Sequence, residues 1–218
     1  MDELFFCYDY NADGVLDRTE AEAVVEGQLS GKFGECENEA NLDSVLINST
    51  YFATIKQWLG ARKLKLDLLY RSSRDTCSYD SMHSKVDNKG PTITVMTSSA
   101  GEIFGGYLSI PFDKKTQGRK ADFKAFLFSL TRQEKYPVKN PQKAYQEDDD
   151  KIFGFGKDDL KIKKTCQGAT FYFGEDYTTT PYVEYSTFST KTMNWLHKEK
   201  DSDFTPLEIE VFQVKTLV

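Results

Sequence analysis

The sequence predicts an α+β fold in which an assembly of short antiparallel strands carries a few helices and follows a small helix–loop–helix unit. Segments with alternating apolar and polar residues recur along the chain, turn-forming residues separate them, and stretches of helical periodicity are few. With 218 residues the chain can form one domain with a sizeable core and one small appendage, but not two full-sized domains.

The central stretch of the chain has three parts: an apolar strand, a polar segment and a hairpin. The strand is predicted at residues 66–70, and residues 71–90, here called the polar crossing, follow it. The hairpin arms are residues 92–97 and 102–108, and the first arm alternates with period two and is rich in β-branched residues. The adjacent Gly105 and Gly106 predict a bulge or a close backbone approach.

The remaining segments give weaker signals. Strands are predicted at residues 121–130, 151–155, 160–162, 169–173 and 207–214. A helix is predicted over residues 42–59, where five residues form an apolar stripe: Val45, Leu46, Phe52, Ile55 and Leu59. Residues 111–120 and 135–150 are expected to be polar loops, and the acidic run at 147–150 is expected to be solvated.

Residues 9–20 match a twelve-residue EF-hand calcium loop at each informative position. Six residues stand where that loop supplies its ligands: Asp9, Asn11, Asp13, Val15, Asp17 and Glu20. Val15 would use its backbone carbonyl, Asp17 would bind directly or through water, and Glu20 would close the site with both carboxylate oxygens. The sequence therefore predicts Ca²⁺ as a ligand, and the alternative is a metal-free surface turn rich in Asp, Asn and Gly.

The flanks of this loop have the periodicity of an entering and an exiting helix, through Leu4, Phe5 and Tyr8 before it and Ala21, Val24, Val25 and Leu29 after it. EF-hands normally pair, yet no second such loop occurs in the 218 residues. Its partner is expected in an absent segment of a longer protein, in another chain, or in the packing of the hand on the following domain. The first is favoured because Met1 falls inside the entering helix.

Five motifs in the rest of the chain resemble a known family. They are LLYRSSRD at 68–75, DNKGPT at 87–92, GEIFGGY at 101–107, GFGKDDLKI at 154–162 and LEIEVFQV at 207–214. In this order they are similar to the signature segments of the TLDc domain. The chain departs from the family at Thr76, where glycine is common, and in the shorter form of the glycine-rich segment at 154–160.

The resemblance implies a fold and a role. TLDc domains consist of two packed antiparallel sheets with helices outside, so the expected architecture is a two-layer β-sandwich preceded by the EF-hand. The domains are expected at 1–30 for the EF-hand, 31–41 for a linker and 42–218 for the TLDc domain. TLDc proteins are associated with oxidation resistance and with binding of the vacuolar-type proton pump, and no cofactor is common to the family.

Composition excludes several other classes of protein. A net charge of −6 and a pI near 5.1 argue against nucleic-acid binding, which needs a concentrated basic face. No apolar run reaches the roughly 18 to 20 residues of a membrane span, and the N-terminus has acidic residues in place of a basic signal-peptide start. A cytoplasmic location without membrane insertion is expected, and so the four cysteines are expected to be free, packed thiols: Cys7, Cys36, Cys77 and Cys166.

No complete catalytic constellation is visible. The two histidines, His83 and His197, stand in no zinc-binding spacing, and GxSxG and GxxxxGK[ST] are absent. The densest polar cluster lies in the polar crossing and comprises Arg71, Arg74, Asp75, His83, Asp87 and Lys89. It is expected to be a structural network in which arginines pair with carboxylates, and the alternative is a polar groove. No catalytic residue is assigned.

Two functions compete. The first is a non-enzymatic, calcium-responsive interaction module that docks on a large protein assembly, such as the vacuolar-type proton pump or a cytoskeletal or axonemal structure. The second is an enzyme with hydrolase or redox-protective activity that uses the polar crossing and the thiols. The lack of a catalytic constellation favours the first.

Overall fold

The structure is a computed structural model, and it describes residues 18, 22, 42–99, 101–148, 151–157, 159–164, 166, 169–171, 176–178 and 202–217. The contacts within the chain divide it into two units. The first unit is Met1–Lys65 together with Lys215–Val218, and the second is Leu66–Val214. No helix in the described ranges is long and apolar enough to span a bilayer.

The described part of the first unit is organised around helix α3 (Ser49–Leu59). The side-chain oxygen of Asn48 accepts a hydrogen bond from Tyr51 N at 2.9 Å and caps the start of the helix, and Gly60 ends it in the left-handed conformation at φ 62°. The predicted helix over 42–59 therefore begins later than expected. Upstream of the cap, Ser44 Oγ accepts hydrogen bonds from Leu46 N and Ile47 N, which hold that stretch in a turn.

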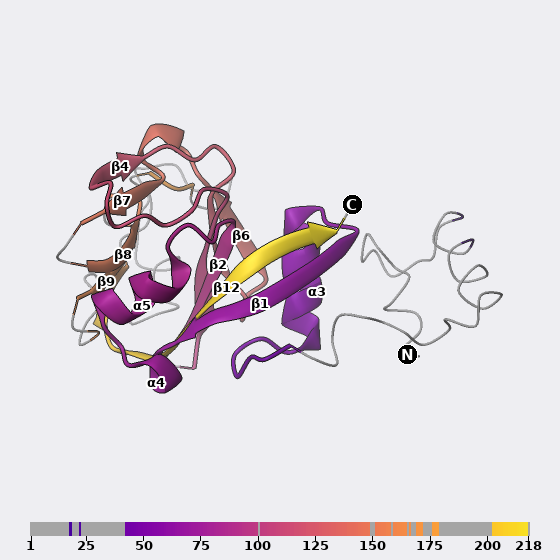
Figure 1. Ribbon diagram of the computed structural model, residues 1–218. Helices are drawn as coiled ribbons and strands as arrows, with labels where there is room; N and C mark the ends of the chain where they lie inside the picture. Colours follow the sequence, from indigo (N-terminus) through magenta and orange to yellow (C-terminus); the bar gives the residue numbers. More distant parts are fainter. Residues whose placement is uncertain are drawn as a thin grey trace. The chain divides into compact units, whose positions relative to one another are not determined.

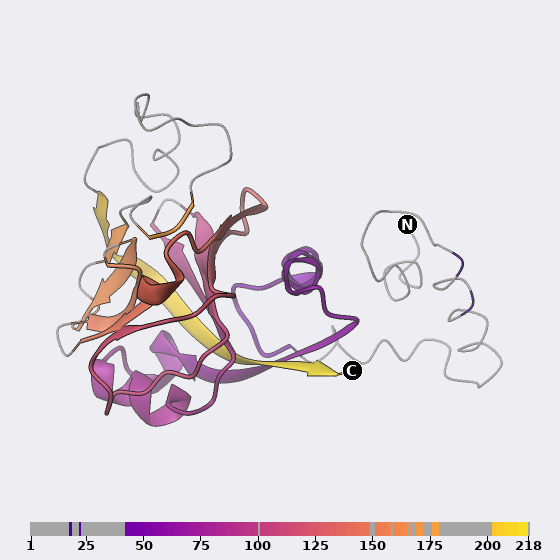
Figure 2. The ribbon, with the colours of Figure 1, turned by 90° about the horizontal axis from the view of Figure 1, so that it is seen from above.

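Two antiparallel sheets organise the second unit, and Figures 1 and 2 show them as separate layers. The first has, in spatial order, β1 (Lys63–Arg71), β12 (Pro206–Leu217), β2 (Thr92–Ser98), β3 (Ile103–Leu108), β5 (Phe126–Ser129) and β6 (Glu134–Pro137). β12 pairs antiparallel with β2, with Glu210 opposite Val95, and runs alongside β1 in both figures. The C-terminal strand therefore lies inside the sheet and separates β1 from β2.

The second sheet contains the shorter strands. Its spatial order is β11 (Ser202–Phe204), β10 (Ala169–Phe171), β9 (Leu160–Lys163), β8 (Lys151–Phe155), β7 (Tyr145–Glu147) and β4 (Gly118–Lys120). Neighbouring strands pair antiparallel throughout this order. The predicted fold class, an α+β domain built on antiparallel sheets, is confirmed for the described residues.

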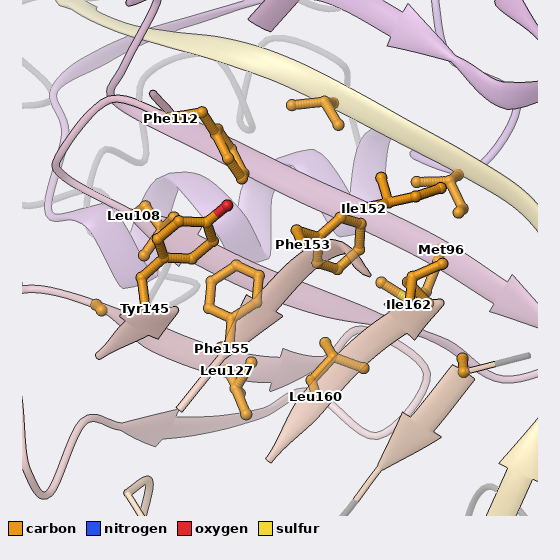
Figure 3. Close-up of a cluster of buried hydrophobic side chains, with 14 of the residues drawn as sticks. Met96, Leu108, Phe112, Leu127, Tyr145, Ile152, Phe153, Phe155, Leu160 and Ile162 are labelled. Carbon is orange, nitrogen blue, oxygen red and sulfur yellow. The ribbon is translucent and has the colours of Figure 1, made fainter. Parts of the chain in front are cut away.

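The core lies between the two sheets. Met96, Leu108 and Leu127 come from the first sheet, and Phe153 and Phe155 of β8 come from the second; all five are buried in one apolar cluster. Figure 3 shows these side chains together with Tyr145 and Phe112, whose rings meet edge to face with centroids 5.2 Å apart. Burial of this apolar surface is the main force that holds the layers together.

The paired glycines of the hairpin mark a close approach and not a bulge, because β2 and β3 pair without a register shift. A Cβ on Gly105 would overlap the carbonyl oxygen of Thr94. A Cβ on Gly106 would lie 2.5 Å from the ring of Phe155, in the other sheet. The absence of a side chain at Gly106 thus lets the aromatic ring of β8 pack directly on the backbone of β3.

The predicted strands at 66–70, 92–97, 102–108, 151–155, 160–162 and 207–214 are confirmed as β1, β2, β3, β8, β9 and β12. The strand expected over 121–130 is wrong in its first half, where Asp122 holds a turn by accepting hydrogen bonds from Ser109 N, Ser109 Oγ and Lys124 N. The loops expected at 111–120 and 135–150 contain β4, β6, β7 and the 3₁₀ helix η1 (Pro141–Lys143).

Candidate functional site

The polar crossing contains two helices, α4 (Ser72–Asp75) and α5 (Tyr79–Val86), where a polar segment was expected. Ser78 caps α5 by accepting a hydrogen bond from Ser81 N at 3.2 Å. Met82 and Val86 point into the core, and α5 packs against β8. This amphipathic packing fixes the polar side chains of α5 at defined positions in the second unit.

Asp75 is the centre of the first network. Arg74 donates to it from Nε to Oδ1 at 3.0 Å and from Nη2 to Oδ2 at 2.7 Å, Arg71 N donates to Oδ2 at 3.0 Å, and Lys85 Nζ lies 3.4 Å from Oδ1. The hydrogen bonds from Arg74, aided by the Arg71 amide and the nearby positive charges, lower the pKa of Asp75 to about 2. The carboxylate therefore stays ionised at neutral pH and is held by these hydrogen bonds and ion pairs.

Two carboxylates of β12 extend the network across the sheet. Arg71 Nε donates to Glu210 Oε1 at 2.7 Å, and the Glu210 side chain is fully buried. Glu208 accepts hydrogen bonds from Ser72 Oγ and from Ser73 N, the latter at 3.0 Å. The two glutamates are two positions apart and share one face of the strand, where they contact α4 and Arg71.

His83 is the centre of the second network. Its Nδ1 lies 2.6 Å from Asp87 Oδ1, and its Nε2 lies 3.2 Å from the carbonyl oxygen of Ile152 and 3.3 Å from Glu147 Oε1. Glu147 also accepts a hydrogen bond from Tyr145 Oη at 2.8 Å. The network joins α5 to β7 and β8 and consists of an acid, an imidazole and a second acid in a row.

Burial determines the electrostatics of this second network. Burial raises the pKa of Glu147, although the neighbouring His83 and the hydrogen bond from Tyr145 oppose the rise. Burial and the neighbouring Glu147 raise the pKa of Tyr145 well above its ordinary value. With His83 only 1% and Glu147 only 2% exposed, both groups find their hydrogen-bond partners inside the domain.

The structure thus separates the predicted polar cluster into two networks. Arg71, Arg74 and Asp75 lie together, His83 and Asp87 lie together 8 to 12 positions further along the chain, and Lys89 is exposed. The expected structural role agrees with these contacts. The sequence did not identify Glu147, because the acidic run that contains it was expected to be solvated, and the structure shows that Glu147 is buried.

A disulfide joins Cys77 to Cys166, with their Cα atoms 5.9 Å apart. The expectation that these two cysteines are free thiols is therefore wrong. Cys77 lies in the turn between α4 and α5, and Cys166 follows β9, so the bond ties the polar crossing to the second sheet. The prediction failed because the pair is 89 positions apart in the sequence and becomes adjacent only in the folded domain.

The six predicted calcium ligands lie outside the described residues: Asp9, Asn11, Asp13, Val15, Asp17 and Glu20. Next to them, the helical residues Arg18 and Glu22 form an exposed ion pair at 2.9 Å. Among the described residues no group of three or more His, Cys, Asp or Glu side chains is arranged to hold a metal ion. The calcium site remains a prediction from the sequence.

Comparison with known proteins agrees with the fold. The TLDc domain family model matches residues 41–215 of the 218, a range that contains all five signature motifs and both polar networks. No curated protein matches the chain. The match spans most of the chain, and the antiparallel sheets lie within it, so the chain belongs to the TLDc domain family.

Proposed function

We propose that the protein is a non-enzymatic interaction module, docking on a large assembly such as the vacuolar-type proton pump or a cytoskeletal or axonemal structure, with calcium binding at residues 9–20 as the signal that alters docking. The observation that carries the proposal is the internal use of the polar crossing. Its carboxylates and its imidazole contact other groups of the domain and not an open site.

The burial of these groups favours an interaction module over an enzyme. A general acid or base must come within hydrogen-bond distance of a substrate, directly or through one water. His83 and Glu147 are enclosed between α5, β7 and β8, and Arg71 is held by Glu210. Opening either network to a substrate would leave a buried charge without its partner, at a large cost in stability.

A surface suited to docking lies on the turn between β4 and β5. Phe123 is 73% exposed, and the neighbouring Asp122 is 2% exposed and fixes the turn through Ser109 and Lys124. Asp122 N also donates to Pro141 O at 2.9 Å. A single exposed aromatic residue is common on protein surfaces. Here the turn is held rigidly, so Phe123 can enter a partner pocket with little loss of conformational entropy.

The calcium response rests on the EF-hand pattern. Four carboxylates, from Asp9, Asp13, Asp17 and Glu20, would face one ion, so the empty loop concentrates negative charge that a divalent cation relieves. Binding would order the loop and change the surface available to a partner. We further propose a cytoplasmic location, where the vacuolar-type pump and the cytoskeleton both present large protein surfaces.

Co-sedimentation of the full chain with purified vacuolar-type pump, and separately with microtubule doublets, tests the proposal. Each assay compares calcium with a calcium chelator. We expect stoichiometric binding to one assembly, with an affinity that changes when calcium is removed. Phe123→Ser should weaken that binding about tenfold or more, as expected for an aromatic anchor. The matched control Val45→Ser, at a residue 66% exposed, should leave it unchanged.

Two results together would contradict the proposal. Binding to neither assembly, combined with turnover of an ester or peroxide substrate by the isolated chain, would support the enzyme. Loss of that turnover in His83→Gln, with full turnover kept in Phe123→Ser, would place the function in the second polar network.

A further inference from the structure

The disulfide between Cys77 and Cys166 connects two parts of the domain that are otherwise joined by non-covalent contacts. One end lies in the polar crossing, directly after the Asp75 network, and the other lies at the end of β9 in the second sheet. Both cysteines are half-buried and pack against the apolar core. The disulfide therefore lies at the margin of the core and not at its centre.

The backbone next to this disulfide is strained. Thr76 has φ 67° and ψ 127°, and Cys166 has φ 58°. Positive φ is uncommon for residues with a Cβ, and for a β-branched threonine it is an outlier that the surrounding structure must impose. Two contacts lie at this position: the hydrogen bond from Tyr70 Oη to Thr76 O, at 3.2 Å, and the disulfide of the next residue, Cys77.

The polar networks on either side hold the domain without this bond. Asp75 is fixed by Arg71, Arg74 and Lys85, and His83 is fixed to β8 through the Ile152 carbonyl. None of these contacts involves a sulfur atom of the disulfide. The disulfide therefore adds to a set of non-covalent contacts that already hold Asp75 and α5 in the domain.

We infer that Cys77 and Cys166 form a reversible redox clasp, a site of covalent modification that a cellular dithiol or glutathione opens and that oxidised glutathione closes. The inference rests on the cytoplasmic location proposed above, because disulfides are rare in that compartment and those that occur are mostly transient or regulatory. In a secreted protein the same bond would serve as a permanent cross-link.

The chemistry is thiol–disulfide exchange. A thiolate of the reductant attacks one sulfur of the clasp, the S–S bond breaks, and a mixed disulfide forms with the other cysteine released as a thiolate that takes up a proton. A second reductant thiolate attacks the mixed disulfide and releases the remaining cysteine, which is protonated in turn. Two electrons pass to the protein, and the reductant leaves as a disulfide.

The first experiment measures the redox state of the clasp. The full chain with Cys7→Ser and Cys36→Ser keeps only the two clasp cysteines. It is equilibrated in glutathione buffers from fully oxidising to the ratio found in cytosol, alkylated, and weighed by mass spectrometry. We expect no alkylation in the oxidising buffer and two alkylated cysteines at the cytosolic ratio. Alkylation of both in the oxidising buffer would show that no clasp forms. Resistance at the cytosolic ratio would show a permanent cross-link, and either result overturns the inference.

The second experiment tests whether the clasp imposes the strain at Thr76. Thr76→Gly removes the penalty for positive φ, so it should raise the melting temperature of the oxidised chain by roughly 3 °C or more. In the reduced chain Thr76 can relax, and the same substitution should raise the melting temperature much less. Equal shifts in the two redox states would show that the clasp does not hold the strain. Neither experiment includes a docking partner, so failure of the proposed function would leave both results unaffected.

Discussion

Arg71 Nε lies 2.7 Å from Glu210 Oε1, and this contact joins the end of β1 to the middle of β12. The Arg71 side chain is 14% exposed and the Glu210 side chain is fully buried. A carboxylate in such a place is stable as an anion only beside a positive charge. Loss of either side chain should therefore weaken the contact between β12 and the polar crossing.

Replacement of Arg71 should destabilise the domain far more than replacement of Arg74. Arg71→Ala removes the cation beside a buried carboxylate and should lower the free energy of unfolding by about 3–5 kcal/mol. Arg74 is 42% exposed, and Asp75 keeps Arg71 N and Lys85 in its absence, so Arg74→Ala should cost about 1 kcal/mol or less. Urea denaturation of both variants measures the difference. Equal losses would show that the Glu210 pair is not critical to stability.

The stability of the domain should depend on Asp75 in acid. Its pKa of about 2 in the folded chain lies below the ordinary value of 3.8, so its contribution to stability is complete above about pH 4 and is lost as the pH falls toward 2. Asp75→Asn lacks this titration. The difference in free energy of unfolding between the parent and Asp75→Asn should therefore shrink from pH 5 to pH 2. A constant difference over that range would contradict the assigned pKa.

The close approach at Gly106 should not tolerate a methyl group. Gly106→Ala places a Cβ 2.5 Å from the Phe155 ring in the packed interior, and overpacking of this kind costs about 1–3 kcal/mol. Gly154→Ala is the matched control, because its nearest neighbour is Cδ of the flexible Lys151 side chain, at 2.9 Å. Thermal unfolding followed by circular dichroism should show a clearly larger loss for Gly106→Ala. The reverse order would mean that β8 can shift away from β3.

Calcium binding should depend more on Glu20 than on Asp17. Glu20 is expected to supply two oxygens and Asp17 to bind through water, so Glu20→Gln should weaken binding much more than Asp17→Asn. A paired hand would bind with a Kd of roughly 10⁻⁷ to 10⁻⁵ M, and a single hand more weakly. Isothermal titration calorimetry of the parent and both variants gives the affinities. The absence of any calcium heat in the parent, or equal losses in the two variants, would refute these ligand roles.

The pattern of neighbouring residues correctly predicted the elements that depend mainly on short-range periodicity and turn residues. The hairpin of β2 and β3 has period-two alternation and a turn, and the structure has it within one residue of the predicted bounds. α5 was missed because it is short and rich in polar residues, so its apolar positions at Tyr79, Met82 and Val86 are diluted. Its capping residue, Ser78, was the signal that could have identified it.

The sequence pattern could not predict contacts between residues that are far apart in the chain. The sequence of an acidic run does not show whether its side chains are solvated or paired. Glu147 is paired because the fold brings His83 within 3.3 Å of it. The same holds for Cys77 and Cys166, which spacing alone does not connect. Residue types in the polar crossing indicated a network of arginines and carboxylates, but the carboxylate that Arg71 contacts, Glu210, lies in β12, more than a hundred residues downstream.

The position of β12 has a consequence for synthesis on the ribosome. β1 and β2 leave the ribosome early, but the strand that lies between them leaves after every other strand of both sheets. Until then each keeps an open hydrogen-bonding edge toward the missing strand, and such edges pair readily with other chains. The domain therefore completes its first sheet only after β12 has been made, and until then β1 and β2 must be kept from pairing with other chains.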